Sequence, residues 1–398
     1  MSLTNPIFTN HEHSISIKKD HDFFCNIRHT IHKNPELGFE EKQTSDLIAD
    51  LLTQWGYAVH RGLAKTGIVA TLKNGDSNKA IGLRADMDAL PIQENTNKTY
   101  QSQVAGKFHG CGHDGHSTIL LACAKQLAKT KNFNGTVHLI FQPAEEFLYG
   151  GKVMLEDGLF DRFPCDVIFS MHNMPRLKTG EFYFKPGPMM ASSDTLHIHI
   201  KGTGSHGAVP EHGIDATVIA CYLVVALQSI VSRNVGPLEQ AVITVGQLSS
   251  GNAPNVVNDS ALLKLSVRTL DTNVRKRVLE RIDEVTNYQA KSFGATAHIE
   301  HINNCPPLIN GKDATEFAIK VAQGLVGADK VHTDILPLMG SEDFAFMLEA
   351  NLNGSYCLIG NGGGPDAYMV HNPAYDFNDD IIAPAGAYFC NLVENYLK

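Results

Sequence analysis

Residues 117–141 read STILLACAKQLAKTKNFNGTVHLIF, a helix-like segment followed by a short apolar run. Apolar residues recur at helical spacing in Ser117–Ala128, whereas Thr136–Phe141 is typical of a buried strand. Similar short runs occur on either side, at Gly67–Leu72, Ala80–Arg84 and Asp166–Met171. Strands that alternate with helices in this way predict an α/β fold, a mixed sheet with helices on both faces.

The pattern changes near Gly187. It predicts the order strand, helix, strand, strand, helix, strand, with elements at Thr195–Ile200, Gly213–Val231, Ala241–Leu248, Ala261–Leu270, Thr272–Ser292 and Ala297–Ile302. This is the order of a ferredoxin-like α+β sandwich. The chain then returns to α/β character and ends in a helix near Ala383–Leu397. We therefore predict one domain of residues 1–186 and 303–398, interrupted by a lid domain of residues 187–302.

Composition excludes several classes of protein. A length of 398 residues favours two domains, and a net charge of -9 with scattered basic residues argues against a nucleic-acid partner. The apolar run Val218–Leu227 is far shorter than the roughly 20 residues of a membrane span. The first residues lack the apolar segment of a signal peptide, and none of the eight cysteines forms a CxxC pair. We expect a cytoplasmic protein without a membrane partner.

The densest cluster of reactive side chains is Gly110-Cys111-Gly112-His113-Asp114-Gly115-His116. Thiol, imidazole and carboxylate groups each offer a lone pair to a metal ion, and glycine lets the backbone approach closely. A hydrogen-bonded turn with one buried thiol is the alternative. Four such side chains within one glycine-rich turn favour metal binding.

Four other segments carry polar side chains where predicted strands end. They contain Asp86 and Asp88 in Leu83–Pro91, Glu145 and Glu146 in Gln142–Glu146, His172 in Met171–Asn173, and His371 in Val370–Pro373. Each of them alone could be an ordinary surface group. Because the strand ends of an α/β sheet open onto one rim, we expect these side chains to converge there.

Together these motifs resemble those of the metallopeptidase-like amidohydrolases. That family includes hippurate hydrolase, aminoacylases, carboxypeptidase G and the plant auxin-conjugate hydrolases, and the hippurate and auxin-conjugate branch is the nearest. Matching stretches run nearly end to end: His32–Gly38, Arg84–Pro91, Cys111–His116, Pro143–Glu146, Gly204–His206, Arg268–Asp271, Gly340–Phe344 and His371–Pro373. The resemblance implies a metallopeptidase-like domain with a ferredoxin-like lid, a homodimer formed through that lid, and hydrolysis of small N-acyl amino acids.

The resemblance also implies a cofactor, two divalent metal ions per chain. Their ligands would be Cys111 as a bridging thiolate, His113, Glu146, His172 and His371. Thiolate and imidazole favour zinc and carboxylates accept manganese, with nickel and cobalt as further options. More distant relatives have a His ligand at the position of Asp86, so a ligand role for Asp86 stays open.

Other roles follow from the same resemblance. Glu145 would be the general base, and Asp88 would hydrogen-bond to a metal ligand and fix its orientation. The lid residue His206 would donate to the oxyanion, often from the partner subunit. Asn255 and Arg268 would contact the substrate, although Arg268 could instead pair with Asp271 or another acid of the lid.

The chemistry agrees with these residue types. An unactivated amide needs a strong nucleophile, and a metal ion lowers the pKa of bound water to about 7. A neighbouring carboxylate can take the water's proton and return it to the leaving amine.

Alternative functions remain. Within the same fold these are an N-acetyl-diaminopimelate deacetylase and a dipeptidase. A nucleotide-binding oxidoreductase would use Gly202–Gly207, which matches GxGxxG after a strand, but Pro210–Gly213 delays the helix that must receive the pyrophosphate. A non-catalytic metal-binding protein would have no use for Glu145 or His206.

Overall fold

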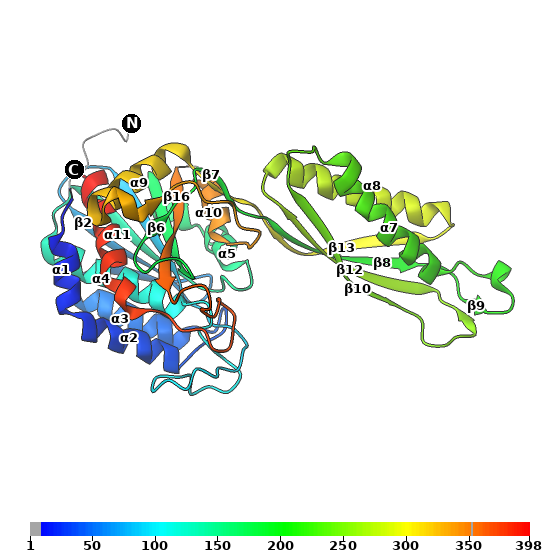
Figure 1. The fold of residues 1–398 in the computed structure, drawn as a ribbon, viewed down its shortest axis with the longest axis horizontal. Helices are drawn as coiled ribbons and strands as arrows, with labels where there is room; N and C mark the ends of the chain where they lie inside the picture. Colours follow the sequence, from blue (N-terminus) through cyan, green and yellow to red (C-terminus); the bar gives the residue numbers. More distant parts are fainter. Residues whose placement is uncertain (1–8, 352) are drawn as a thin grey trace. The chain divides into compact units, whose positions relative to one another are not determined.

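The computed structural model describes residues 9–351 and 353–398 and divides into two compact units (Figure 1). Unit 2 comprises Pro188–Leu308 and Pro337–Glu342, and unit 1 comprises the rest of the described chain. Unit 2 therefore differs from the predicted lid of residues 187–302 in two respects. Its last strand continues to Cys305, and residues 337–342 join it because Ala191 N–H donates to the carbonyls of Leu338 and Gly340.

Unit 1 is built on an eight-stranded sheet in the order β1-β2-β4-β3-β5-β16-β6-β15. The strands are β1 Ala58–Leu63, β2 Gly67–Asn74, β3 Ala80–Asp86, β4 Gly135–Gln142, β5 Val167–Pro175, β6 Phe182–Tyr183, β15 Val331–His332 and β16 Gly354–Gly362. The central strands β4, β3, β5 and β16 run parallel, while β1, β2 and β6 pair antiparallel to their inner neighbours. The predicted mixed sheet is confirmed.

Helices cover both faces of this sheet. On one face α4 and α11 pack on each other and on β3, and on the other α5 packs on β4 and on α10 (Figure 1). Because α4 lies between the sheet and other helices, nearly all of its side chains are buried. The helices are α1 Glu12–Lys19, α2 His21–Lys33, α3 Lys42–Gln54, α4 His113–Thr130, α5 Gly150–Glu156, α6 Leu159–Arg162, α9 Lys312–Val326, α10 Phe344–Ala350 and α11 Ile382–Tyr396.

The α4 helix begins at His113, four residues before the predicted Ser117. The motif Cys111–His116 is thus not a simple turn, because its last four residues form the first turn of this helix. Gly112 precedes the helix with φ +94, a left-handed conformation that favours glycine. A Cβ atom at Gly112 would lie 2.4 Å from Nδ2 of Asn173 and 2.5 Å from the hydroxyl of Tyr375.

Unit 2 has a four-stranded antiparallel sheet in the order β10-β12-β8-β13, with two helices packed on it. Its elements are β8 Ser193–Lys201, α7 Ala216–Asn234, β10 Ala241–Ser250, β12 Ser260–Thr269, α8 Thr272–Ser292 and β13 Thr296–Cys305. This is the element order predicted for a ferredoxin-like sandwich. The shorter strands β9 Ser205–His206 and β11 Val256–Val257 also belong to unit 2, while β7 Gly187–Met190 and β14 Leu308–Asn310 pair with each other in a separate two-stranded sheet.

The α7 helix is long and apolar enough to cross a membrane by length and composition alone. Its buried side chains include Ile219, Leu223, Leu227 and Ile230, which recur every three or four residues. A single buried stripe at this spacing is typical of a helix that packs on a sheet in a folded domain. The apolar composition of α7 is therefore explained by its packing on the sheet of unit 2.

Candidate metal centre

The predicted ligands meet at the carboxyl edge of the parallel strands of unit 1. Glu146 follows β4, His172 lies near the end of β5, and His371 lies in the loop after β16. Cys111 and His113 stand at the start of α4, which packs on the same strands. Ligand sites of open α/β sheets collect at this edge, because the loops that leave parallel strands all emerge there.

The side chains form two groups that share Cys111. One is Cys111, His113 and His172, the other is Cys111, Glu146 and His371, and the ligand atoms of each group lie within 4.8 Å of one another. The Sγ of Cys111 is 3.3 Å from Nε2 of His172, and Nε2 of His371 is 3.4 Å from a carboxylate oxygen of Glu146. A shared thiolate between two triads suits two metal ions with a sulfur bridge.

Two buried polar atoms in this cluster lack a hydrogen-bond partner. They are Nε2 of His113 and Oε1 of Glu146, which lie 3.8 Å apart. Buried polar groups without a partner are rare, because each one forfeits the hydrogen bonds it made to water. A cation between these atoms would satisfy both, so the residues fit a metal ion.

The electrostatics of the site also favour a cation. Burial and the carboxylates of Glu146 and Glu145 raise the pKa of the Cys111 thiol well above its usual range. Burial raises the pKa of Glu146 to about 7, against the opposing effect of His113. Without a cation the Cys111 thiol would keep its proton at neutral pH, and Glu146 would be partly protonated. A metal ion replaces those protons, since its ligands must be deprotonated.

Hydrogen bonds turn two imidazoles towards the centre. The Nδ1 of His113 lies 3.2 Å from Oδ1 of Asp88, and Nδ1–H of His172 donates to the carbonyl of Asn173 at 2.5 Å. These contacts place the proton of each neutral ring on Nδ1, which leaves the Nε2 lone pair for a metal. Without a metal ion, burial would lower the pKa of His113 but Asp86 and Asp88 raise it to about 10, so a bound ion would replace the Nε2 proton of this ring.

Asp88 also holds the two glutamates. Its Oδ1 accepts the backbone N–H of Glu145 at 3.1 Å, and its Oδ2 accepts that of Glu146 at 3.0 Å. The carboxylate is almost fully buried. One side chain therefore sets the positions of His113, Glu145 and Glu146 together. The Oε2 of Glu145 lies 3.9 Å from Nε2 of His113.

Asp86 and His116 bind each other. The Oδ1 of Asp86 accepts Nδ1–H of His116 at 2.6 Å, and its Oδ2 accepts a proton of Arg84 at 2.9 Å. The Nε2 of His116 accepts the backbone N–H of Asn173 at 3.0 Å. Both oxygens of Asp86 and both ring nitrogens of His116 are thus engaged within the protein.

Asp114 faces away from the centre. Its Oδ2 lies 2.7 Å from Nδ1 of His32 and 3.1 Å from Nη1 of Arg28. The glycine-rich segment therefore does not direct all of its polar side chains to one point, and the resemblance names only Cys111 and His113 of them as ligands. Successive residues of a helix point about 100° apart, so the first turn of α4 cannot aim all its side chains at one point.

Glu41 was not predicted as a functional residue, yet its side chain holds the loop that carries Glu145 and Glu146. Its Oε1 accepts the backbone N–H of Ala144 at 2.9 Å, and its Oε2 accepts the hydroxyl of Thr66 at 2.6 Å. Ala144 has φ +53 and His371 has φ +67, conformations that non-glycine residues hold only when their surroundings enforce them. The one signal for Glu41 was its place just beyond the motif His32–Gly38.

Comparison with known proteins agrees with this geometry. The family model of peptidase family M20/M25/M40 matches residues 82–395. The chain belongs to this family.

Relatives place the chain more closely within the M20 family. It is 46% identical to the hippurate hydrolase of Campylobacter jejuni, over 94% of this chain and 97% of that protein. It is 37% identical to the IAA-amino acid hydrolase ILR1-like 2 of Arabidopsis thaliana, over 95% of this chain and 86% of the relative. These similarities confirm the predicted family and enzyme class, an amidohydrolase.

A solved structure shows the same fold. The YXEP protein of Bacillus subtilis, described as a dinuclear metal binding peptidase from the M20 family, is 32% identical with a TM-score of 0.82. The match covers 96% of this chain and 99% of that one. The fold class is thereby confirmed.

Two of the predicted M20 lid residues lie together in unit 2. His206 is on β9, which pairs with β11 through Val256, and the carbonyl of Asn255 accepts the N–H of Gly207 at 2.7 Å. The Nδ1 of His206 accepts the N–H of Ala208 at 3.0 Å. This bond puts the proton of the neutral ring on Nε2, so the exposed side of the ring is a hydrogen-bond donor.

Arg268 is held by neighbours other than Asp271. Its Nη1 donates to the hydroxyl of Ser341 at 2.6 Å and to the carbonyl of Met339 at 3.5 Å. The carboxylate of Asp271 instead caps α8, accepting the N–H groups of Asn273 and Val274. The alternative of an Arg268–Asp271 pair is therefore wrong.

The segment Gly202–Gly207 does not open into a helix. It leads into β9 and then a short turn at Pro210–His212, and α7 begins only at Ala216. The first N–H groups of α7 are capped by the side chain of Asp215. A pyrophosphate would find no free helix N-terminus directly after this loop, which excludes the nucleotide-binding alternative.

Proposed function

We propose that the chain hydrolyses the amide bond of small N-acyl amino acids, releasing a carboxylate and a free amino acid. The convergence of Cys111, His113, Glu146, His172 and His371, with Glu145 beside them, supports this reaction most directly. The names of the two relatives support the substrate class, since hippurate and IAA-amino acids are both amino acids with an acylated nitrogen.

In this proposal the ligands hold two divalent ions. Cys111, His113 and His172 would bind one, and Cys111, Glu146 and His371 the other. Asp86 is not proposed as a ligand, because Arg84 and His116 use both of its oxygens. Bound ions would supply Lewis acidity and lower the pKa of water to about 7. The donor set suits zinc or manganese, with nickel and cobalt as further options.

The proton steps belong to Glu145. Its carboxylate takes a proton from the attacking water as the water oxygen bonds to the amide carbon. It returns that proton to the nitrogen as the carbon–nitrogen bond breaks, so atoms and charge balance. Asp88 positions the carboxylate through the backbone N–H of Glu145. Nε2–H of His206 donates to the oxyanion, and Arg268 with Asn255 binds the substrate's α-carboxylate.

We also propose that unit 2 forms a homodimer. Val218, Tyr222 and Val225 are exposed on α7 at the i, i+4, i+7 spacing of one helix stripe. An exposed apolar stripe of this kind marks an association surface. Val225→Glu should convert a dimer into a monomer in sedimentation velocity, while Lys276→Glu on α8 should not. A wild-type monomer at assay concentration would contradict the proposal.

A reducing compartment, the cytoplasm, is the proposed location. All eight cysteines are free thiols in the described chain. Free buried thiols are usual where glutathione keeps cysteine reduced.

The proposed activity is tested with a panel of substrates. The chelated enzyme is reloaded with manganese, zinc, nickel or cobalt and assayed on N-acetyl, N-benzoyl and indole-acetyl amino acids, with dipeptides and N-acetyl-diaminopimelate as competitors. We expect metal-dependent release of free amino acid from the simple N-acyl amino acids. Preference for a dipeptide or for N-acetyl-diaminopimelate would replace the proposal by the corresponding alternative.

A further inference from the structure

A second group of potential ligands lies on unit 2, on the strands β8 and β13. His197 and His199 alternate along β8, so both side chains lie on the same face of the sheet. On β13, Glu300 is the register partner of His197, and His298 is the register partner of His199. All four side chains are at least partly exposed. They face away from the buried side of the sheet, where Ile198 and Ile200 pack in the core of unit 2.

Three of these side chains converge on one point. The Oε2 of Glu300 lies 3.8 Å from Nδ1 of His197 and 3.5 Å from Nε2 of His199. The three ligand atoms lie within 4.8 Å of one another. Two ligands on a tetrahedral ion with bonds of about 2.1 Å are roughly 3.4 Å apart. The group therefore needs only small side-chain rotations to close around an ion.

We propose that His197, His199 and Glu300 bind one divalent transition-metal ion, in addition to the ions of the metal centre in unit 1. Two neutral imidazoles and one carboxylate favour zinc, copper or nickel over magnesium or calcium, which prefer oxygen ligands. Three protein ligands leave a coordination position for water.

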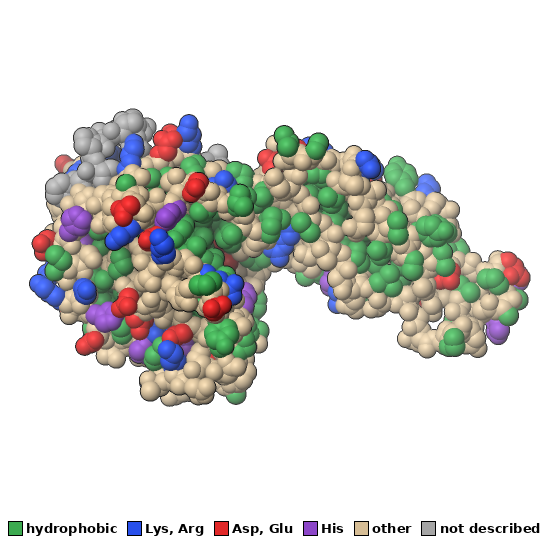
Figure 2. All heavy atoms as spheres, in the orientation of Figure 1, with side chains coloured by type: hydrophobic (Ala, Val, Ile, Leu, Met, Phe, Trp, Pro, Cys, Tyr) green, Lys and Arg blue, Asp and Glu red, His purple; other side chains and the backbone are tan. Residues whose placement is uncertain are grey.

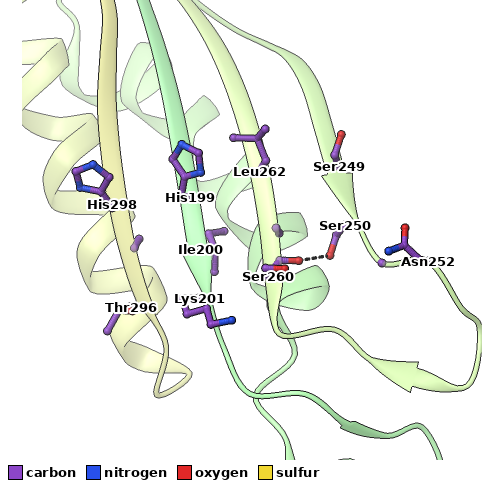
Figure 3. Close-up of a pocket in the computed structure, with 13 residues that line it drawn as sticks. His199, Ile200, Lys201, Ser249, Ser250, Asn252, Ser260, Leu262, Thr296 and His298 are labelled. Atoms are coloured by element: carbon purple, nitrogen blue, oxygen red, sulfur yellow. Dashed lines mark hydrogen bonds between the residues drawn. The ribbon is translucent and has the colours of Figure 1, made fainter.

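The surroundings leave space for this ion and its water. A hollow of about 510 Å³ opens beside the group, lined in part by His199, Lys201, Ser250 and His298 (Figure 3). Figure 3 shows the rings of His199 and His298 on neighbouring strands, and their centroids are 6.3 Å apart. The ammonium of Lys201 pairs with Asp259 at 2.5 Å, which partly offsets its charge at the site.

The ion would connect two strands. In the sheet order β10-β12-β8-β13, β13 is an edge strand that pairs with β8 alone. A metal ion held by both strands stabilises their pairing, because it binds the folded sheet and not the unfolded chain. The same group without metal would be only an exposed contact between the Glu300 carboxylate and two imidazoles, which contributes little to stability.

Measuring how many zinc ions the full chain binds, and how tightly, distinguishes a metal site from an exposed contact without metal. Wild type, His199→Gln, Glu300→Gln and the control Lys201→Gln are stripped with a chelator and titrated with zinc in a calorimeter. The control replaces a residue two positions from His199 on the same face and removes no ligand. The substituted side chains of His199 and Glu300 are 48% and 53% exposed, so these variants should fold, which circular dichroism checks.

We expect His199→Gln and Glu300→Gln each to bind one zinc ion fewer than wild type, or to bind it at least tenfold more weakly. Lys201→Gln should keep that ion. Only the difference between proteins is compared, so the result does not depend on how many ions unit 1 holds or on any activity. Equal zinc stoichiometry and affinity in wild type and either ligand variant would overturn the proposal.

Discussion

The carboxylate of Asp88 contacts Nδ1 of His113 at 3.2 Å while it accepts the backbone N–H groups of Glu145 and Glu146. A metal ligand, a general base and a second ligand are thus positioned by one buried side chain. All three contacts require an oxygen that accepts, and a neutral amide offers only one such oxygen. The metal centre and the proton-transfer group should therefore respond together to a change at Asp88.

Asp88→Asn should lower metal affinity about 10- to 100-fold, the usual cost of losing the hydrogen-bond partner of a metal-bound histidine. The amide cannot accept from Glu145, Glu146 and His113 at once, so kcat should also fall at saturating metal. Competition with a chromogenic chelator measures the affinity. The exposed Asp334→Asn serves as the control, and a variant with wild-type affinity and kcat would contradict this role of Asp88.

Substitutions at the two neighbouring glutamates should have different effects, on turnover for Glu145 and on metal binding for Glu146. Glu145→Gln removes the base while conserving volume, so it should keep its metal and lose about 10²–10⁴ in kcat. Glu146→Gln should lose metal, because the substitution removes a charged ligand whose buried Oε1 has no hydrogen-bond partner. Metal content by elemental analysis, together with kcat, distinguishes the two. Equal metal loss in both variants would contradict the assignment.

His206→Ala should lower kcat by about 10²–10³ with little change in metal content, as expected for losing one oxyanion donor. Ser205→Ala, one residue away on β9, is the matched control. If the partner subunit supplies His206, mixing His206→Ala with Glu145→Gln should restore activity, since a heterodimer rebuilds one intact site. Full activity of His206→Ala alone would leave His206 as a surface residue.

We expect Arg268 to bind the free α-carboxylate of the substrate and so to favour substrates that carry it. The planar guanidinium donates two parallel hydrogen bonds, which Lys cannot reproduce. Arg268→Lys should therefore lower kcat/KM strongly, and Arg268→Met should largely erase the preference for the free acid over its amide. Arg281→Met on α8 is the control. A loss of stability with unchanged preference would instead show that Arg268 serves mainly its contact with Ser341.

Stability should fall at alkaline pH because of His32. Burial alone would lower its pKa, but Asp114 raises it from 6.5 to about 9. The protonated ring therefore stabilises the native state fully below about pH 6.5, and this contribution is lost as pH rises through 9. The loss is on the order of 3 kcal/mol at most. Urea unfolding at pH 6 and pH 9 should show a smaller difference in His32→Gln than in wild type or the exposed control His212→Gln. Equal differences in all three would contradict the coupling.

The sequence predicted the elements of unit 2 closely. The predicted helix Thr272–Ser292 has the same bounds as α8, and the strand predicted at Ala261–Leu270 is shifted by one residue in β12. Alternating burial in strands and a buried stripe in helices are local patterns, so a single segment carries the information. The residue types at the metal centre could also be recognised from single segments, since Cys, His and Glu side chains are groups that bind metal ions.

The direction of each side chain was decided by the tertiary structure. His113 and Asp114 are neighbours in one motif, yet His113 faces the centre and Asp114 faces Arg28 and His32, because a helix turns its side chains about 100° per residue. Asp86 and Asp88 have the same side chain but different hydrogen-bond partners, and those partners are set by segments that are distant in the sequence. The sequence by itself determined the types of element and of ligand. Which of two similar groups faces the metal depended on how distant segments pack together.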